Sequence, residues 1–501
     1  MKQLHLKLIE DSASWRKGMV HLRRTSACMA IVLVSLLAGC SSDKVVNPDD
    51  ITEVKEKYGS ESGKVTLKLL SGASQQGRVN SLASTRTIRN KDALTLVATI
   101  KPVDKLVDKI WSASAIAIDD AKKRVYITWH SDRQAATQAA EWGGALDVFD
   151  ITNEDHPQSK RAAISPDMKF NHVFIHGDKL FLAATSNQNA GAVGRLSLDN
   201  GDIIDTETID RIGFPGTSVN AVAAYGDRLI AVSGHAKGTY ATFAPAVDAV
   251  PYYYGKKDSV QLISPMYEPM EEFGGKFVAS DKDGNVYVLH NTTGKNATLI
   301  NVTAETSISL DCSLKSNSKA AESYDEVTGE WNIGNNKSDF YGKHTFVVHG
   351  GYAYVACGKN GLRVYDLATG DSTWANKTYT IGVCTDGEYL YTATGAGLRI
   401  YRMKEKGELG LVAFEVEEYD EKGAPIWTWD KDKEDNENAA TTGTKERHSP
   451  NYVAVNLHED STYIYIAYGQ SGVRVYKFTP SEFLVELDPY AGIVLEPEFG
   501  L

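Results

Sequence analysis

Seven stretches of the chain share one pattern, in which an apolar run leads through a turn into a second apolar run. The three C-terminal copies are the clearest, because each continues through a glycine turn into a strand that alternates apolar, Arg, apolar and Tyr. Alternation with a period of two is typical of a half-buried strand, and paired runs across a short glycine turn predict a hairpin. The three hairpins are Ala353–Tyr365, Leu390–Tyr401 and Ile464–Tyr476.

Looser copies of the same unit precede these hairpins. The second strands of the seven units fall at Val125, Leu180, Leu229, Val286, Ala353, Leu390 and Ile464. A three- or four-stranded sheet cannot bury both of its faces alone, whereas sheets packed radially around an axis bury them against one another. No long segment has the 3.6-residue period of a helix. The sequence therefore predicts an all-β fold, a seven-bladed β-propeller over residues 92–480, rather than a pair of β-sandwiches.

The segments on either side of the repeats complete the predicted organisation. Ala93–Ile100 is an apolar strand that precedes the first unit, and we expect it to close the ring by completing the last blade. Residues 40–91 are polar enough to predict a linker, within which Lys64–Leu70 has the pattern of an extra strand. Residues 481–501 are expected to form a C-terminal tail.

The N-terminus has the pattern of an export signal. Two arginines precede the apolar run Ala27–Leu37, which ends in Leu-Ala-Gly-Cys at Cys40. The run is shorter than the about 20 residues that span a bilayer, so we read residues 1–39 as a signal peptide whose true start is Met19. Leu-Ala-Gly-Cys resembles the lipobox of bacterial lipoproteins, which implies a Cys40 that carries acyl chains such as palmitate and tethers the protein to a lipid bilayer.

Charge and cysteine content argue against several classes of protein. From residue 40 onward, 47 Lys and Arg residues face 63 Asp and Glu residues, a net charge of −16 that argues against nucleic-acid binding. Besides Cys40, this part holds only Cys312, Cys357 and Cys384. Cys357 and Cys384 lie in apolar runs, which favours buried free thiols over a bridge. No Cys-x-x-Cys or His-x-x-x-His pair indicates a zinc site.

The repeat cores resemble a known group of propellers. Gly361–Gly370 with Trp374, and Asp283–Gly294, are similar to the repeats of LVIVD-type and PQQ-like propellers. That resemblance implies the fold but not the activity, because such propellers include scaffolds, ligand binders and enzymes. A PQQ enzyme is disfavoured because the chain lacks a pair of adjacent cysteines. Leader and composition resemble Bacteroides-type surface lipoproteins, and the residue after Cys40 is not Asp, which favours the outer membrane.

Long insertions between units are candidate binding loops. Residues 239–275 contribute aromatic side chains, which either stack on a ligand such as a sugar or form a local core. Residues 304–342 also contain aromatic residues, but their many Asn and Ser residues favour a solvated flap. Residues 415–447 are strongly charged, and their carboxylates either hold Ca²⁺ or are simply solvated. The candidate binding residues are Tyr252, Tyr253, Tyr254, Trp331, Trp427 and Trp429, and the candidate calcium ligands are Asp430, Asp432 and Asp435.

A second candidate site lies near the starts of the first strands, which line the axis of a propeller. His172, Asn220, His344 and Asn451 occupy similar places there. They either converge at a channel mouth around a metal, water or ligand group, or they make hydrogen bonds between neighbouring blades, which we favour.

No recognisable motif marks a catalytic site. The Gly-x-Ser-x-Gly elbow and the phosphate-binding Gly-rich loop are both absent from the sequence. The sequence therefore favours a membrane-anchored, non-enzymatic propeller that binds a glycan or protein partner at the cell envelope. The alternatives are a polysaccharide lyase or hydrolase that uses a channel histidine as its base, and an assembly scaffold.

Overall fold

A computed structural model describes the chain as strands joined by turns, within a unit that begins at Pro48. The described residues are 63–70, 78–81, 88–89, 93–102, 111–131, 143–186, 191–204, 206–214, 218–234, 240–243, 261–263, 275–290, 296–312, 314, 324–325, 330–331, 344–358, 360–376, 380–394, 397–415, 448–469, 471–481, 484 and 486–487. Among them, no helix is long and apolar enough to cross a membrane.

The first four blades follow one another along the chain, each an antiparallel sheet. Blade 1 consists of β6 (Trp111–Asp119), β7 (Arg124–Ser131), β8 (Gly144–Asp150) and β9 (Gln158–Ser165). Blade 2 consists of β10 (Met168–His176), β11 (Lys179–Ser186), β12 (Gly191–Asp199) and β14 (Thr208–Phe214), with the short β13 (Asp202–Ile203) beside β12. Blade 3 consists of β15 (Ser218–Tyr225), β16 (Arg228–Gly234), β17 (Tyr240–Phe243) and β18 (Gln261–Ile263). Blade 4 consists of β19 (Gly275–Ser280), β20 (Val286–His290), β21 (Thr298–Asn301) and β22 (Thr306–Ser309).

The remaining blades contain the three clearest repeats. Blade 5 consists of β25 (Phe346–His349), β26 (Tyr352–Ala356), β27 (Leu362–Asp366) and β28 (Ser372–Asn376). Blade 6 consists of β29 (Thr380–Thr385), β30 (Tyr389–Thr394), β31 (Gly397–Met403) and β32 (Leu409–Glu415), with the 3-10 turn η6 (Glu405–Gly407) before β32. Blade 7 consists of β33 (His448–Leu457), β34 (Thr462–Gly469) and β35 (Val473–Phe478), joined by β5 (Leu94–Ile100). A separate hairpin of β23 (Tyr324–Asp325) and β24 (Glu330–Trp331) lies between blades 4 and 5 in the sequence.

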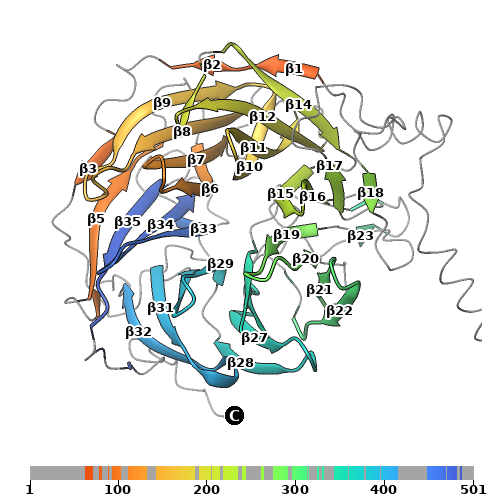
Figure 1. The fold of residues 1–501 in the computed structure, drawn as a ribbon, viewed down its shortest axis with the longest axis vertical. Coiled ribbons are helices and arrows are strands. Elements are labelled where there is room, and N and C mark those ends of the chain that lie inside the picture. The colour runs from red at the N-terminus through yellow and green to blue at the C-terminus, as the bar shows by residue number, and fades with distance from the viewer. Residues whose placement is uncertain are drawn as a thin grey trace, which may run out of the picture. The chain divides into compact units, whose positions relative to one another are not determined.

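The first strands of the blades surround one axis (Figure 1). Strands β6, β10, β15, β19, β25, β29 and β33 contact one another in that order, and β33 contacts β6 again. A single bridge between Ala113 and Gly469 also joins blade 1 to blade 7. This closed cycle confirms the predicted propeller and is consistent with seven blades.

The ring is closed by a strand from the N-terminal side, as predicted. β5 pairs antiparallel with β35, so blade 7 is built from two parts of the chain that are far apart in sequence. The pairing runs from Leu94 opposite Phe478 to Ile100 opposite Val473. Alternate residues of β5 are buried, and these apolar residues face the core of blade 7. This burial favours the pairing of β5 with blade 7 in this register.

The predicted linker over residues 40–91 differs from the structure in its described parts, which pair with the outer edges of four blades. The pieces are β1 (Gly63–Thr66) on β14, β2 (Lys68–Leu69) on β9, β3 (Val79–Ser81) on β5 and β4 (Ile88–Arg89) on β32. Val65 and Leu67 are buried in the core between blades 1 and 2. The extra strand expected at Lys64–Leu70 is present as two short strands, β1 and β2, which pair with different blades. Polar composition was misleading because an edge strand needs only a few apolar positions to cover a sheet edge.

Part of the segment predicted as a tail also packs on the ring. Leu484 is buried in the core between blades 6 and 7, and the Leu487 amide donates to the Leu411 carbonyl over 2.7 Å. Glu486 forms an ion pair with Lys404 at 2.7 Å. These contacts attach the described residues after 480 to the outer strand of blade 6.

The hydrophobic core lies between blades rather than at one centre. Each large cluster combines residues of neighbouring sheets, such as Leu146 of blade 1 with Leu180 of blade 2. The pattern follows from sequence, because alternate positions of each strand face opposite sides of a sheet and both sides meet another blade.

Candidate functional site

A repeated irregularity marks the start of the first strands. In blades 1, 2 and 3 the register with the second strand shifts at one residue, which leaves Ser114, Asn171 and Asn220 as bulged positions. A bulge turns a side chain away from the regular pleat and toward its surroundings. Asn451 lies just before Tyr452, in the segment between His448 and Tyr452 where the register of blade 7 is also irregular.

Several side chains at these positions join one blade to the next. Ser114 Oγ donates to the Phe170 carbonyl at 2.9 Å, and the Asn171 amide donates to the Val219 carbonyl at 2.9 Å. In blade 5, which has Thr345 at this place, the hydroxyl donates to the Val383 carbonyl at 3.1 Å.

Two of the predicted site residues belong to this set of inter-blade bonds. The Asn220 amide donates to the Gly275 carbonyl at 2.7 Å, and its Oδ1 accepts from Ser218 Oγ at 2.9 Å. The Asn451 amide donates to the Ala113 carbonyl of blade 1 at 2.5 Å. Both side chains are 1% exposed. The structure therefore places them between neighbouring blades, the arrangement that the sequence favoured.

His172 and His344 lie at other positions of the repeat. His172 follows the bulge in blade 2, whereas His344 precedes Thr345 in blade 5, so the four candidates are not structurally equivalent. His344 is buried, and its Nδ1 lies 3.1 Å from the Ala356 carbonyl oxygen of its own blade. The sequence pattern suggested that the four residues occupy equivalent places in their strands. A bulge inserts one extra residue into a strand, so positions counted by alternation along the sequence no longer correspond between blades.

Aromatic rings meet across the axis at the position that follows the bulge. The His172 ring lies 5.4 Å from that of Phe277 and 5.6 Å from that of Tyr452, and Phe277 lies 5.9 Å from Phe346. These rings come from blades 2, 4, 5 and 7, so their contacts span the centre of the ring. The other blades place small residues there, namely Ala115, Ala221 and Gly382, and a Cβ on Gly382 would lie 3.2 Å from the Tyr452 backbone. Large and small residues thus combine to fill the axis.

Burial determines the protonation of His172. The Val222 amide donates to His172 Nδ1 at 3.4 Å, and Nε2 lies 3.4 Å from the Tyr452 hydroxyl. Desolvation among aromatic rings lowers the pKa of His172 to about 3, so the ring is neutral at pH 7 and carries its proton on Nε2. Burial likewise raises the pKa of the Tyr452 hydroxyl.

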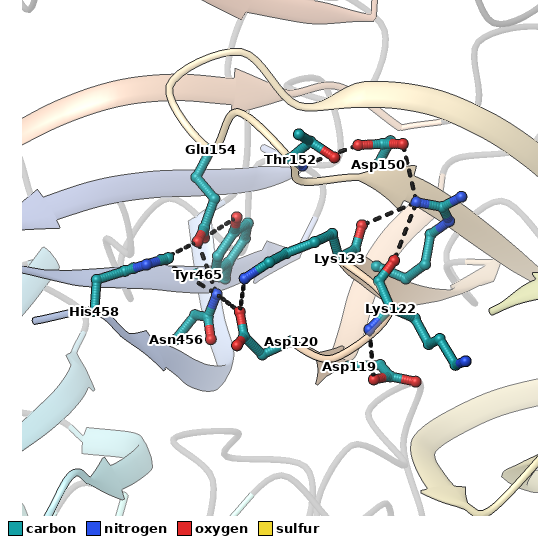
Figure 2. Close-up of polar contacts among 11 residues, drawn as sticks. Asp119, Asp120, Lys122, Lys123, Asp150, Thr152, Glu154, Asn456, His458 and Tyr465 are labelled. Carbon is teal, nitrogen blue, oxygen red and sulfur yellow. Dashed lines mark hydrogen bonds and ion pairs between the residues drawn. The ribbon is translucent and has the colours of Figure 1, made fainter. Parts of the chain in front are cut away.

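A polar cluster, hereafter the closure cluster, lies where blade 7 meets blade 1 (Figure 2). It consists of Asp120, Glu154, Asn456, His458 and Tyr465. Glu154, in the turn between β8 and β9, accepts hydrogen bonds from Tyr465 OH at 2.6 Å, Asn456 Nδ2 at 2.7 Å and His458 Nε2 at 2.5 Å. Asn456 Nδ2 also donates to Asp120 Oδ1 at 3.0 Å.

Exposure divides the closure cluster into a buried support and an outer surface. Glu154 and Asn456 are 4% and 5% exposed, whereas the His458 side chain is 36% exposed and that of Asp120 is 52% exposed. The Lys123 ammonium contacts Asp120 at 2.6 Å, and its hydrogen bond together with that of Asn456 lowers the pKa of Asp120. The outer groups are therefore held in place by the buried ones, and they offer a cation, a carboxylate and an imidazole edge to a polar ligand.

Sequence reasoning missed the closure cluster. Asn456 and His458 alternate on β33 and its end, which places them on one side of the strand, but nothing in the sequence links them to Glu154, some 300 residues earlier (separations of 302 and 304). A weak signal was present, because two polar residues at alternate positions follow the apolar run 452–455.

The Arg-Val-Tyr motif of the third strands has a structural role. In blade 7, Arg474 and Tyr476 both bind Glu415 at the end of blade 6, with Tyr476 OH donating to Oε2 at 2.6 Å. In blade 5, Arg363 and Tyr365 bind Asp311 of blade 4 in the same way. Arg474 and Arg363 thus each bind a carboxylate of the preceding blade.

The predicted loop residues fall largely outside the described part of the chain. Trp331 is placed on β24, with its backbone paired to Tyr324. The other aromatic candidates, the calcium candidates and the lipid-attachment residue lie outside the described residues: Tyr252, Tyr253, Tyr254, Trp427, Trp429, Asp430, Asp432, Asp435 and Cys40.

Similarity to known proteins is confined to the repeat and its architecture. The LVIVD repeat family matches residues 345–372, which lie in blade 5. The solved structure of BamB from Moraxella catarrhalis is 10% identical, with a TM-score of 0.38 over 84% of this chain and 99% of that one. RRP9 WD40 repeats are 7% identical, with a TM-score of 0.43 over 79% and 99% of the two chains. No curated protein sequence matches the chain.

Proposed function

We propose that this propeller is a non-enzymatic binding protein, anchored by lipid on Cys40 to the outer membrane, and that its partner is a glycan or another protein. The observation that supports a binding role is the closed, internally bonded ring. Polar groups of the first strands bind neighbouring blades, and aromatic rings fill the axis. Groups for recognition therefore lie on the faces and in the long segments between strands.

The closure cluster provides a defined part of such a face. Lys123, Asp120 and His458 are exposed or half-exposed. Asn456 binds Asp120, Glu154 binds His458, and Asp120 in turn pairs with Lys123. Because the outer groups are fixed before binding, little conformational entropy is lost when they bind hydroxyl or amide groups of a partner.

The enzyme alternative has less support. A lyase or hydrolase at the channel mouth would need His172 or His344 as a base in contact with substrate. Both histidines are buried, and both have hydrogen-bond contacts within the fold.

Ligand binding is tested by thermal unfolding of the full-length protein with a panel of glycans and with detergent-solubilised envelope proteins. A ligand at one hundred times its dissociation constant adds roughly 2.7 kcal/mol of stability. We expect one class to raise the Tm, and His458→Ala or Lys123→Ala to weaken that effect. Lys179→Ala is the matched control, because Lys179 forms a similar exposed ion pair with Asp178 in blade 2. Turnover of a glycan that is lost with His172→Gln would instead support an enzyme.

Anchoring is tested separately with Cys40→Ser. We expect the wild-type protein to incorporate labelled palmitate and to sediment with outer membranes, and the variant to do neither. Labelling of the variant would contradict attachment at Cys40.

A further inference from the structure

Two cysteines meet at the junction between blades 4 and 5. Cys312 lies just after β22 and Cys357 just after β26, and their Sγ atoms are 2.7 Å apart. The two residues are 3% and 0% exposed. Because an S–S bond is about 2.05 Å long, a small rotation of either side chain would bring the sulfurs to bonding distance.

The backbone holds both cysteines in place. The Ala297 amide donates to the Cys312 carbonyl at 2.7 Å, and the Cys357 amide donates to the Gly361 carbonyl at 2.8 Å. Both side chains pack in the same apolar cluster as Phe346. Their proximity therefore follows from the main chain and the core, not from the orientation of one exposed side chain.

The surroundings distinguish the two sulfurs chemically. Tyr365 OH lies 3.4 Å from Cys312 Sγ and donates to Asp311 at 2.6 Å, and Asp311 is also paired with Arg363. Hydrogen bonds from Cys357 and Tyr365 lower the pKa of Cys312, whereas burial raises the pKa of Cys357. In the packed junction, Cys312 is therefore the sulfur that ionises more readily.

We propose that Cys312 and Cys357 form a disulfide that joins blade 4 covalently to blade 5. The thiolate of one cysteine attacks the disulfide of a protein thiol–disulfide oxidant and displaces one of its sulfurs as a thiolate. The thiolate of the other cysteine then attacks the sulfur of the first in the mixed disulfide and releases the second sulfur of the oxidant. The protons lost by the two cysteines end on the two thiols of the reduced oxidant.

Burial sets the order of events. Since neither sulfur is accessible in the folded ring, the exchange takes place before blade 5 packs on blade 4. An oxidising compartment, as proposed from the export signal, is where such a bond persists. The bond does not depend on Cys40 or on the identity of the ligand.

Peptide mapping of the wild-type protein tests the bond directly. The full-length protein is purified without reductant, unfolded in N-ethylmaleimide and digested. We expect Cys384, on β29 of blade 6, to be alkylated, and Cys312 and Cys357 to appear as one linked peptide pair until a reductant is added. Alkylation of both without reduction would overturn the proposal, and so would a link between two chains on a non-reducing gel.

Two variants provide a second measurement. Cys357→Ala should expose Cys312 to alkylation after unfolding, while Cys384→Ala should leave the linked pair intact. Both variants remove one thiol, but only the first opens the loop that spans 45 residues, so its Tm should fall by roughly 4 °C more. Equal falls would contradict the disulfide. If Cys357→Ala fails to fold, the peptide map of the wild-type protein still decides.

Discussion

The junction between blades 7 and 1 differs from that between blades 4 and 5 in how it uses charge. At the first, Glu154 and Asp147 are almost fully buried, and each carboxylate accepts hydrogen bonds from at least two side chains. At the second, Asp311 has a side chain that is 55% exposed, and apolar residues and two cysteines form the buried contact.

The closure cluster and Asp311 also differ in the distance along the chain that their bonds span. The bonds of the closure cluster join residues separated by 302 to 336 positions, whereas those of Asp311 join residues separated by 52 to 54. Apolar packing is non-directional and tolerates sliding, while a buried carboxylate is stabilised only when its donors are in register. The closure cluster thus places directional contacts where distant parts of the chain must be aligned.

The largest expected effect concerns Asp147, which binds Arg78 through two hydrogen bonds of 2.8 and 2.5 Å and accepts another from Trp129. Asp147→Ala leaves the Arg78 guanidinium, 2% exposed, without its counter-charge. We expect a loss of about 3–5 kcal/mol in the free energy of unfolding, measured by urea denaturation. A loss below about 1 kcal/mol would show that buried charge does not stabilise the junction between blades 7 and 1.

The packed axis, unlike the two junctions, is expected to make the stability of the protein depend on pH through His172. The pKa of His172 is about 3 when folded and near 6.5 when unfolded, so between these values the unfolded chain binds more protons. Stability is therefore complete above pH 6.5 and falls as the pH decreases toward 3, by up to about 1.4 kcal/mol per pH unit. His172→Phe should flatten this part of a Tm-against-pH curve. An unchanged slope would assign the acid sensitivity to other groups, such as His290, whose pKa burial lowers to about 4.

A smaller effect is expected for Glu154, which accepts the hydroxyl of the buried Tyr465. Glu154→Ala leaves that hydroxyl and the Asn456 amide short of an acceptor, which should cost about 1–3 kcal/mol in thermal or urea unfolding. His458→Ala is the control, because a half-exposed ring can be replaced by water. A larger loss for His458→Ala than for Glu154→Ala would contradict the division into buried support and outer surface.

The smallest effect is expected at the other junction. Asp311→Ala removes an ion pair with Arg363 in which both side chains reach solvent, so we expect a loss of no more than about 1 kcal/mol. Urea denaturation beside Asp147→Ala gives the contrast directly. Equal losses would remove the distinction between the two junctions.

The sequence by itself determined the repeat and therefore the architecture. Period-two alternation and the glycine turn place Leu362 and Val364 in the core, and they are 1% and 0% exposed. The strand Leu94–Ile100 was identifiable as the closing strand because it is an apolar run that precedes the first unit, at the other end of the chain from the last blade. These features are local, so a short window of sequence contains them.

Tertiary structure alone decided how the polar residues are used. A bulge of one residue makes Asn171, not His172, the equivalent of Asn220, and alternation cannot locate such an insertion. The sequence predicted that Arg78 lies in a polar linker, whereas in the structure it binds Asp147, 69 residues away. Which partner a polar side chain binds depends on what lies near it in space, and residues far away in sequence can lie there. The burial of an apolar side chain follows from its place in a strand, which the local sequence pattern predicts.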